Sequence, residues 1–308
     1  MNTLDWNDHP KDWWQTWRPA DGEPVCVTGS PDWWYHNVAP GTSSSQLKTI
    51  VQRSELHYRW SLSHKDEEED YKKPSARLLG RVLHAFVFEP QTVDERFIFA
   101  SNVELTKKAG KEAWAAMETD AQSTDREIVR ADYDQFVRMA DAIRSHKGWR
   151  HVTGPAPLVE AAIFWTDPET GLALKVRPDN LNLAFGTQAN IALCADLKSA
   201  EDASDTAFRG AVKRYAYDLS AAMYQDGVQT WSQQSGGWCW LVFEKKRPYA
   251  TRIIFAGPEW LARGRALYRE ALLRLAESER TDVWPGYDQG RPVVLPFQRY
   301  DALQPKAE

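Results

Sequence analysis

Apolar residues in the first half of the chain recur at the spacing of amphipathic helices. In the segment near 75–88, four of them fall on one helical face, namely Leu79, Leu83, Phe86 and Val87. A serine cluster at 43–45 is a favourable N-cap for an earlier helix. We therefore predict a mostly helical first half. One helix is expected to start at 43–45, and three more are expected near 75–88, over 106–122 and over 130–147.

The second half carries shorter apolar runs that predict β-strands. Strands are predicted at 159–165, 172–177, 191–198, 238–243 and 251–255, and helices at about 203–226 and 258–279. A loop that contains Gly186 and Asn190 is expected before the third strand, and the last two strands are expected to form a hairpin. The predicted fold class is α/β, with a central mixed β-sheet flanked by helices and a helical N-terminal part. We divide the chain into a Trp- and Pro-rich arm at 1–40, which we expect to be irregular, a main domain at 41–290 and a C-terminal tail at 291–308.

The composition is that of a globular protein, with 43% hydrophobic and 26% charged residues among 308. No apolar run reaches the ~18 residues of a membrane helix, and the N-terminus has no secretion-signal pattern. The three scattered cysteines argue against a disulfide framework, a zinc site or an iron–sulfur cluster, so a reducing cytoplasm is expected. A net charge of −5 excludes a protein held on nucleic acid by bulk charge alone, so DNA binding would need a local basic lining.

Tryptophan is concentrated near the N-terminus, at positions 6, 13, 14, 17, 33 and 34. One interpretation is an arm packed on its own domain or on a neighbouring subunit. The other is a platform on which nucleic-acid bases stack, since aromatic side chains stack well on bases. Nothing else in the segment favours the second interpretation.

Charged residues follow the predicted strands in an order that suggests chemistry. Asp196 and Lys198 point to one face of a strand because side chains alternate along it. Asp179 ends the neighbouring strand, and Glu160 begins the preceding one. An Asp-x-Lys pair alone is most simply an ion pair. The whole order, in contrast, gathers three carboxylates and an ammonium at one end of a sheet.

Carboxylates in close approach raise one another's pKa unless a cation lies between them. A hard divalent ion with oxygen ligands is a natural solution, and Mg²⁺ is usually held by one or two carboxylates plus waters and phosphate oxygens. A neighbouring lysine can orient or deprotonate an attacking water and stabilise developing charge. The pattern therefore indicates a site for phosphodiester hydrolysis.

The chain resembles the PD-(D/E)XK nucleases through Glu160, the Pro178–Asp179 pair and the Asp196-Leu-Lys198 sequence. Further motifs are similar to the RecE/exonuclease VIII-like branch of phage recombination nucleases, which is related to the RecB and lambda-exonuclease groups. They are Ser43-Ser-Ser-Gln-Leu47 with Ser54 and Tyr58, Leu79 to His84 followed by Glu89-Pro90, Tyr215 to Gly227, and Trp284-Pro-Gly-Tyr287. The resemblance covers roughly residues 35–290.

The resemblance implies roles for individual residues. The metal ligands would be the side chains of His84, Glu160, Asp179 and Asp196 and the carbonyl of Leu197. Lys198 would position the nucleophilic water. The metal would be Mg²⁺, with Mn²⁺ able to substitute.

A DNA path is predicted from two sets of basic and hydroxyl residues. They are Arg77 and Arg81 before His84, and Arg209, Lys213, Ser220 and Tyr224 along the predicted helix 203–226. Ser220 stands where the family usually has a Gln that supports the lysine or the scissile phosphate. A serine is shorter and would have to act through a water. The alternative is that the basic residues form an ordinary solvated helix face.

The resemblance implies an exonuclease that digests linear double-stranded DNA from 5′ to 3′ and leaves 3′ single strands for recombination. Its partners would be DNA ends and a RecT-like single-strand annealing protein. It would act in the bacterial host cytoplasm as a ring-shaped homo-oligomer, a trimer or tetramer. The alternatives are a RecB-like or CRISPR-associated nuclease of other polarity, and a catalytically weak DNA-binding module on the same fold.

Overall fold

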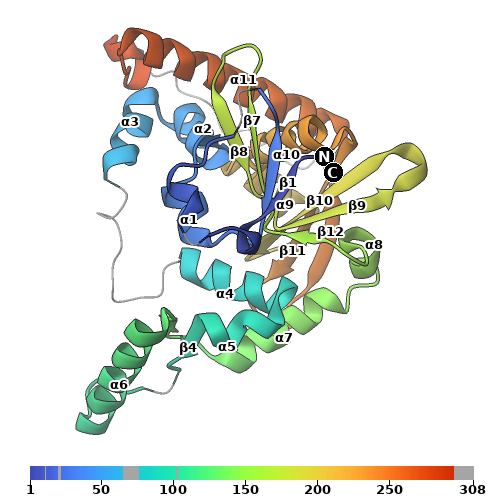
Figure 1. Cartoon of the computed structure of the whole chain (residues 1–308). Coiled ribbons are helices and arrows are strands. Elements are labelled where there is room, and N and C mark those ends of the chain that lie inside the picture. The colour runs from blue at the N-terminus through green and yellow to red at the C-terminus, as the bar shows by residue number, and fades with distance from the viewer. Residues whose placement is uncertain (11, 20–21, 65–75, 102, 295–308) are drawn as a thin grey trace, which may run out of the picture.

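The protein has a mixed α/β fold, confirming the predicted class, in a computed structural model that describes residues 1–10, 12–19, 22–64, 76–101 and 103–294. Its strands form two five-stranded mixed sheets in the middle of the molecule (Figure 1), together with a parallel pair, β4 (Phe97–Phe99) and β5 (Glu127–Val129). Within these described ranges, no helix is long and apolar enough to cross a membrane.

The first sheet, which we call the β10 sheet, has the order β12-β11-β10-β9-β6. β10 pairs in parallel with β11 and antiparallel with β9. A hairpin joins β11 to β12, as predicted. The strands are β6 (Leu158–Val159), β9 (Asn180–Gly186), β10 (Ile191–Ala200), β11 (Ser235–Glu244) and β12 (Thr251–Phe255).

The second sheet, which we call the β7 sheet, has the order β1-β2-β7-β8-β3. Its strands are β1 (Thr3–Asp5), β2 (Val25–Thr28), β3 (Thr42–Ser43), β7 (Ala162–Thr166) and β8 (Ala173–Val176). Residues 1–40 were expected to be irregular, and this is wrong, because β1 and β2 extend the sheet beside β7. Short strands between prolines and glycines gave no sequence signal of their own.

Helices cover the sheets on several sides (Figure 1). α10 packs against strands of both sheets and against α11, which forms one long edge of the molecule. α4 packs on α7, and α6 extends away from the body in Figure 1. The helices are α1 (Asp32–Asn37), α2 (Ser44–Gln52), α3 (Glu55–Ser63), α4 (Ala76–Phe88), α5 (Val93–Arg96), α6 (Lys108–Thr124), α7 (Tyr133–Arg144), α8 (Trp149–Thr153), α9 (Asp205–Arg214), α10 (Tyr217–Ser232) and α11 (Pro258–Thr281).

The start of α2 shows how the sequence sets an element that later bears on the site. Ser43 is its N-cap and forms a capping box with Gln46, whose side chain accepts the Ser43 backbone N–H at 2.8 Å. Leu47 and Ile50 are fully buried in the main core. The predicted helix start at 43–45 is therefore confirmed.

The helix predicted over 203–226 is in fact two helices. α9 ends at Arg214, and Ala216 adopts a left-handed conformation with φ of 47° before α10 begins. One continuous helix would place Tyr215 on the same apolar face as Phe208 and Leu219, but Tyr215 is 48% exposed. Alanine is a strong helix former, so no residue marked the break.

The N-terminal tryptophans pack on one another and on the β7 sheet. The rings of Trp6 and Trp34 lie 4.9 Å apart, and Trp17 meets Phe164 of β7 edge-on at 5.4 Å. Trp34 is 1% exposed. This packing favours the interpretation of an arm packed on its own domain.

Candidate active site

Asp179 and β10 lie together at one edge of the β10 sheet. Asn180, the first residue of β9, pairs with Ala195 of the antiparallel strand β10, which brings Asp179 level with Asp196. The Leu197 backbone N–H donates to Asp179 Oδ2 at 2.7 Å. Asp179 was expected to end the predicted strand 172–177, but it precedes β9, which had been predicted as a loop. Asp179 is close to β10 as expected, but it is held there by β9 and not by the predicted strand 172–177.

Asp196 and Lys198 share one face of β10, as the alternation of strand side chains requires. Lys198 Nζ lies 2.5 Å from Asp196 Oδ2, and it also lies 5.2 Å from the centre of the Tyr217 ring. Leu197 is half-buried against the core beside α4 and α7, and its carbonyl accepts a bond from Lys198 Nζ at 3.4 Å.

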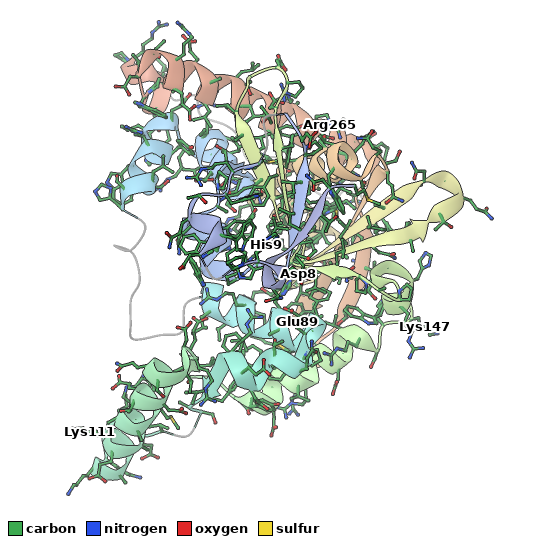
Figure 2. The ribbon with its side chains drawn as sticks, in the orientation of Figure 1. Asp8, His9, Glu89, Lys111, Lys147 and Arg265 are labelled. Carbon is green, nitrogen blue, oxygen red and sulfur yellow. The ribbon has the colours of Figure 1, made fainter. Side chains whose placement is uncertain are left out.

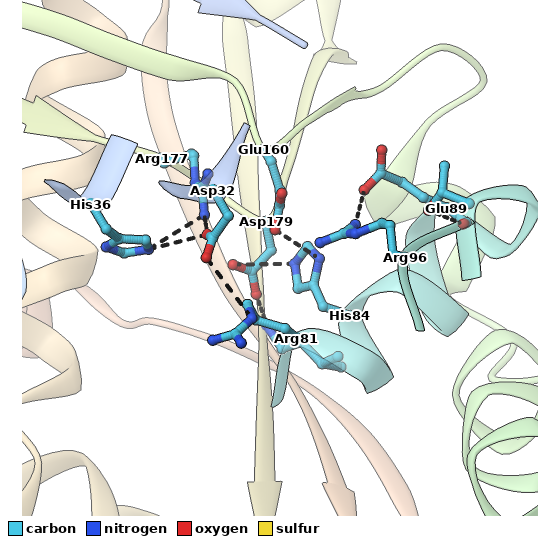
Figure 3. A network of polar contacts seen from close by, with 11 residues as sticks. Asp32, His36, Arg81, His84, Glu89, Arg96, Glu160, Arg177 and Asp179 are labelled. Carbon is cyan, nitrogen blue, oxygen red and sulfur yellow. Dashed lines mark hydrogen bonds and ion pairs between the residues drawn. The ribbon is translucent and has the colours of Figure 1, made fainter. Parts of the chain in front are cut away.

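Glu160 and His84 complete the cluster from two other elements. Glu160 lies between β6 and β7 with a φ of 48°, a left-handed conformation that costs energy for a residue with a Cβ. That kink interrupts the strand predicted over 159–165. His84 projects from α4 between two carboxylates (Figure 3), with Nδ1 at 3.2 Å from Glu160 Oε1 and Nε2 at 3.4 Å from Asp179 Oδ1.

The charges of the cluster shift the pKa values of its members in different directions. Burial raises the pKa of the Asp179 carboxyl, but His84, Lys198 and the Leu197 N–H outweigh it and lower that pKa to about 2. Burial and the charge of Asp179 raise the pKa of Asp196, although Lys198 opposes them. Burial lowers the pKa of His84, yet Asp179 and Glu160 raise it overall. Two carboxylates in unlike environments thus share one site.

The donor set fits a hard divalent cation. Both ring nitrogens of His84 are buried, and no hydrogen-bond partner for them lies among the described residues, although carboxylates flank both. Asp196 is turned toward Lys198, and in the described ranges no three His, Cys, Asp or Glu side chains yet converge as metal ligands. Glu160, Asp179, Asp196 and His84 nonetheless supply the oxygen and imidazole donors that Mg²⁺ or Mn²⁺ accepts.

An ion-pair network borders the cluster and was not predicted. Arg177 pairs with Asp32 of α1, and Arg81 lies 3.9 Å from the other Asp32 oxygen (Figure 3). The positive charge of Arg177 also interacts with the carboxylate of Glu160. Asp32 and Arg177 are 145 residues apart, so no local sequence pattern could have paired them.

The basic residues predicted for a DNA path lie in different surroundings. Arg81 is paired with Asp32 and with Glu127. Arg209 and Lys213 are exposed on α9. Arg77 lies in α4, but its side chain is outside the described residues. Because α9 and α10 are separate helices, Arg209 and Lys213 do not continue the helix face of Ser220 and Tyr224.

Ser220 and Tyr224 lie on α10 near the cluster. The Ser220 hydroxyl donates to Ser44 Oγ of α2 at 3.0 Å, so it links two helices. Tyr224 packs edge-on against Trp238 at 5.3 Å. Burial raises the pKa of its phenol well above the usual value, and Asp196 and Asp179 add to that shift.

Comparisons with known proteins identify the fold and the family. A nuclease-like fold is also seen in a solved structure from Eubacterium rectale described as a "Putative exonuclease", with a TM-score of 0.58 and 16% identity over 87% of this chain and 96% of that chain. The sequence profile of the PDDEXK-like domain of unknown function (DUF3799) matches residues 43–290. The chain belongs to this family and is a member of the PD-(D/E)XK nuclease superfamily, as predicted. A comparison with curated proteins gives no match.

Proposed function

We propose that the protein is a Mg²⁺-dependent exodeoxyribonuclease that digests linear double-stranded DNA from 5′ to 3′ and leaves 3′ single strands. The observation that carries the proposal is the meeting of Asp179, Asp196 and Lys198 with Glu160 and His84 at one edge of the β10 sheet. Membership of the family supports a nuclease. Because PD-(D/E)XK nucleases generally use divalent metal ions, it also supports a metal-dependent reaction.

In the proposed hydrolysis, different residues bind the metal and position the water. Glu160, Asp179, Asp196 and His84, with the Leu197 carbonyl, would hold the metal, which when bound polarises the phosphate and lowers the pKa of a water. The Leu197 N–H fixes the orientation of the Asp179 carboxylate. Lys198 carries a positive charge beside Asp196, where it orients the attacking water and stabilises charge that develops on the phosphate.

The proposal extends to partners and assembly. The substrates are DNA ends, the partner is a RecT-like single-strand annealing protein, and the assembly is a ring-shaped trimer or tetramer. The chain has a net negative charge, so bulk charge would not hold it on DNA. A ring that encloses the duplex would keep the protein on DNA without such attraction.

A linear duplex labelled at the 5′ end of one strand and the 3′ end of the other tests the activity. With Mg²⁺ we expect early release of the 5′ label, late release of the 3′ label, and no loss of a closed circular duplex. Early release of the 3′ label would indicate the RecB-like polarity instead. Binding of duplex ends without any Mg²⁺-dependent release would favour the non-catalytic module.

A further inference from the structure

A second lysine, Lys48 of α2, lies beside the Asp196–Lys198 pair. Lys48 Nζ is 5.5 Å from the centre of the Tyr217 ring, and Lys198 Nζ is 5.2 Å from the same ring. Two ammonium groups from distant parts of the chain therefore gather around one aromatic side chain of α10. Because Lys198 is paired with Asp196, sharing the Tyr217 ring with Lys198 places Lys48 at the candidate active site.

The position of Lys48 is fixed by the packing of α2. Ser44 lies one helical turn earlier on the same face, and its hydroxyl accepts the bond from Ser220 of α10. Ser44 is 4% exposed, and the apolar side of α2 is anchored in the main core. A rigid helix thus presents Lys48 to the site.

Among the described residues, Lys48 has no ion-pair partner of its own. Lys198, in contrast, is paired with Asp196. Lys48 is only partly exposed. Burial lowers the pKa of Lys48 to about 8, and Lys198 adds to this, against the opposing charges of Asp196 and Asp218. A partly buried ammonium next to another is stabilised when an anion binds between them.

We propose that Lys48 binds a backbone phosphate of the DNA at the candidate active site, beside Lys198 and Tyr217. The inference rests on the proposed function, because the anion is taken to be the nucleic-acid substrate. A phosphate is the anion that a lysine binds as a point charge, and such a contact positions the backbone without reading sequence. Ser220 stands at the position of the usual Gln, and its hydroxyl binds Ser44 of α2, the helix that carries Lys48. On this side of α10, we infer that the cation comes from α2.

Binding and kinetics of Lys48→Met test the proposal. We measure binding of a fluorescent linear duplex without divalent metal by anisotropy across a salt series, and kcat and KM with Mg²⁺. We expect binding to weaken about tenfold or more and its salt slope to fall by about 0.9, the value for one phosphate contact. KM should rise more than kcat falls, because a phosphate contact is made in both ground and transition states. Lys48→Arg should restore most of the loss.

The matched control is Lys111→Met, which removes the same charge from α6, away from the sheets (Figure 2). It should leave affinity, salt slope and kinetics unchanged. Lys48→Gln repeats the test if Lys48→Met does not fold by circular dichroism. Unchanged affinity and slope in a folded Lys48 variant would overturn the inference while leaving the nuclease proposal intact. A wild-type protein that binds DNA through Lys48 but never degrades it would overturn only the proposed function.

Discussion

Asp196 is the carboxylate whose environment most clearly calls for a cation. It faces the Lys198 ammonium at 2.5 Å and shares the site with the charged Asp179. Its partner is the Lys198 ammonium, so its main contribution is electrostatic.

Asp196→Ala should lower Mg²⁺-dependent hydrolysis by more than about 100-fold. Loss of a residue that only supports a ligand costs about 10–100-fold, and Asp196 is proposed as a ligand itself. The fold should remain, since no core packing is lost. The measurement pairs degradation of a linear duplex with circular dichroism. A folded variant with wild-type rates would show that Asp196 is not a metal ligand.

Lys198→Ala should retain metal binding but lose about 10²–10³-fold in kcat, because lysine stabilises developing charge and is no ligand for Mg²⁺. Calorimetric titration with Mn²⁺ and single-turnover hydrolysis separate the two effects. Loss of Mn²⁺ binding in this variant would argue against a purely chemical role for the lysine.

The sequence alone could identify Asp179, Asp196 and Lys198, because strand alternation and motif order bring them together. It could not identify Lys48, Asp32 or Arg177 as neighbours of the site. These residues reach the site from α1, from α2 and from the position just after β8, and only tertiary packing defines their contacts.

At the scale of elements, the break between α9 and α10 separates the predicted DNA path into two parts. Ser220 and Tyr224 stay near the cluster, whereas Arg209 and Lys213 are exposed on α9. Helix periodicity predicted most helices because apolar spacing sets them. It missed the break because a left-handed alanine leaves no trace in an apolar pattern.

The double variant Arg209→Ala with Lys213→Ala tests whether α9 contacts DNA. If both residues bind phosphates, the slope of log affinity against log salt should fall by up to about 2. Affinity is measured by anisotropy on duplexes of different sequence, which should behave alike. An unchanged slope would assign both residues to an ordinary solvated helix face.

An ion pair ties α11 to α3 and predicts a pH-dependent stability. Arg274 binds both oxygens of Glu55, at 2.7 and 2.9 Å, and Glu55 is 6% exposed. Burial raises the pKa of Glu55, but the Arg274 hydrogen bonds lower it overall. A lowered folded-state pKa means that the pair stabilises the protein above the unfolded pKa of about 4.3 and ceases to do so as pH falls through the folded value.

Arg274→Met should therefore lower the free energy of unfolding by about 2 kcal/mol at pH 7, and the difference from wild type should shrink as the pH falls below about 4. Urea unfolding at several pH values measures it. Arg280→Met on the same helix is the control, because its pair with Glu277 is exposed and should contribute little. A pH-independent difference would contradict the assignment to Glu55.

At the scale of the whole molecule, the chain has an acidic net charge, whereas the substrate that we propose for it is a polyanion. We expect an oligomer in solution, because enclosure replaces bulk attraction. Light scattering should give a mass three or four times the 35.2 kDa of the chain. A mass of 35.2 kDa at working concentration would show a monomer and contradict the ring-shaped assembly.

The most direct test of the central claim compares wild-type protein with Asp179→Asn on an end-labelled linear duplex. The amide keeps an oxygen for the Leu197 N–H but removes the charge that faces His84. We predict that wild type degrades the duplex with Mg²⁺ and not with a chelator, and that the folded Asp179→Asn variant leaves it intact. Equal degradation by both proteins, or degradation by wild type in the presence of the chelator, would contradict the central claim.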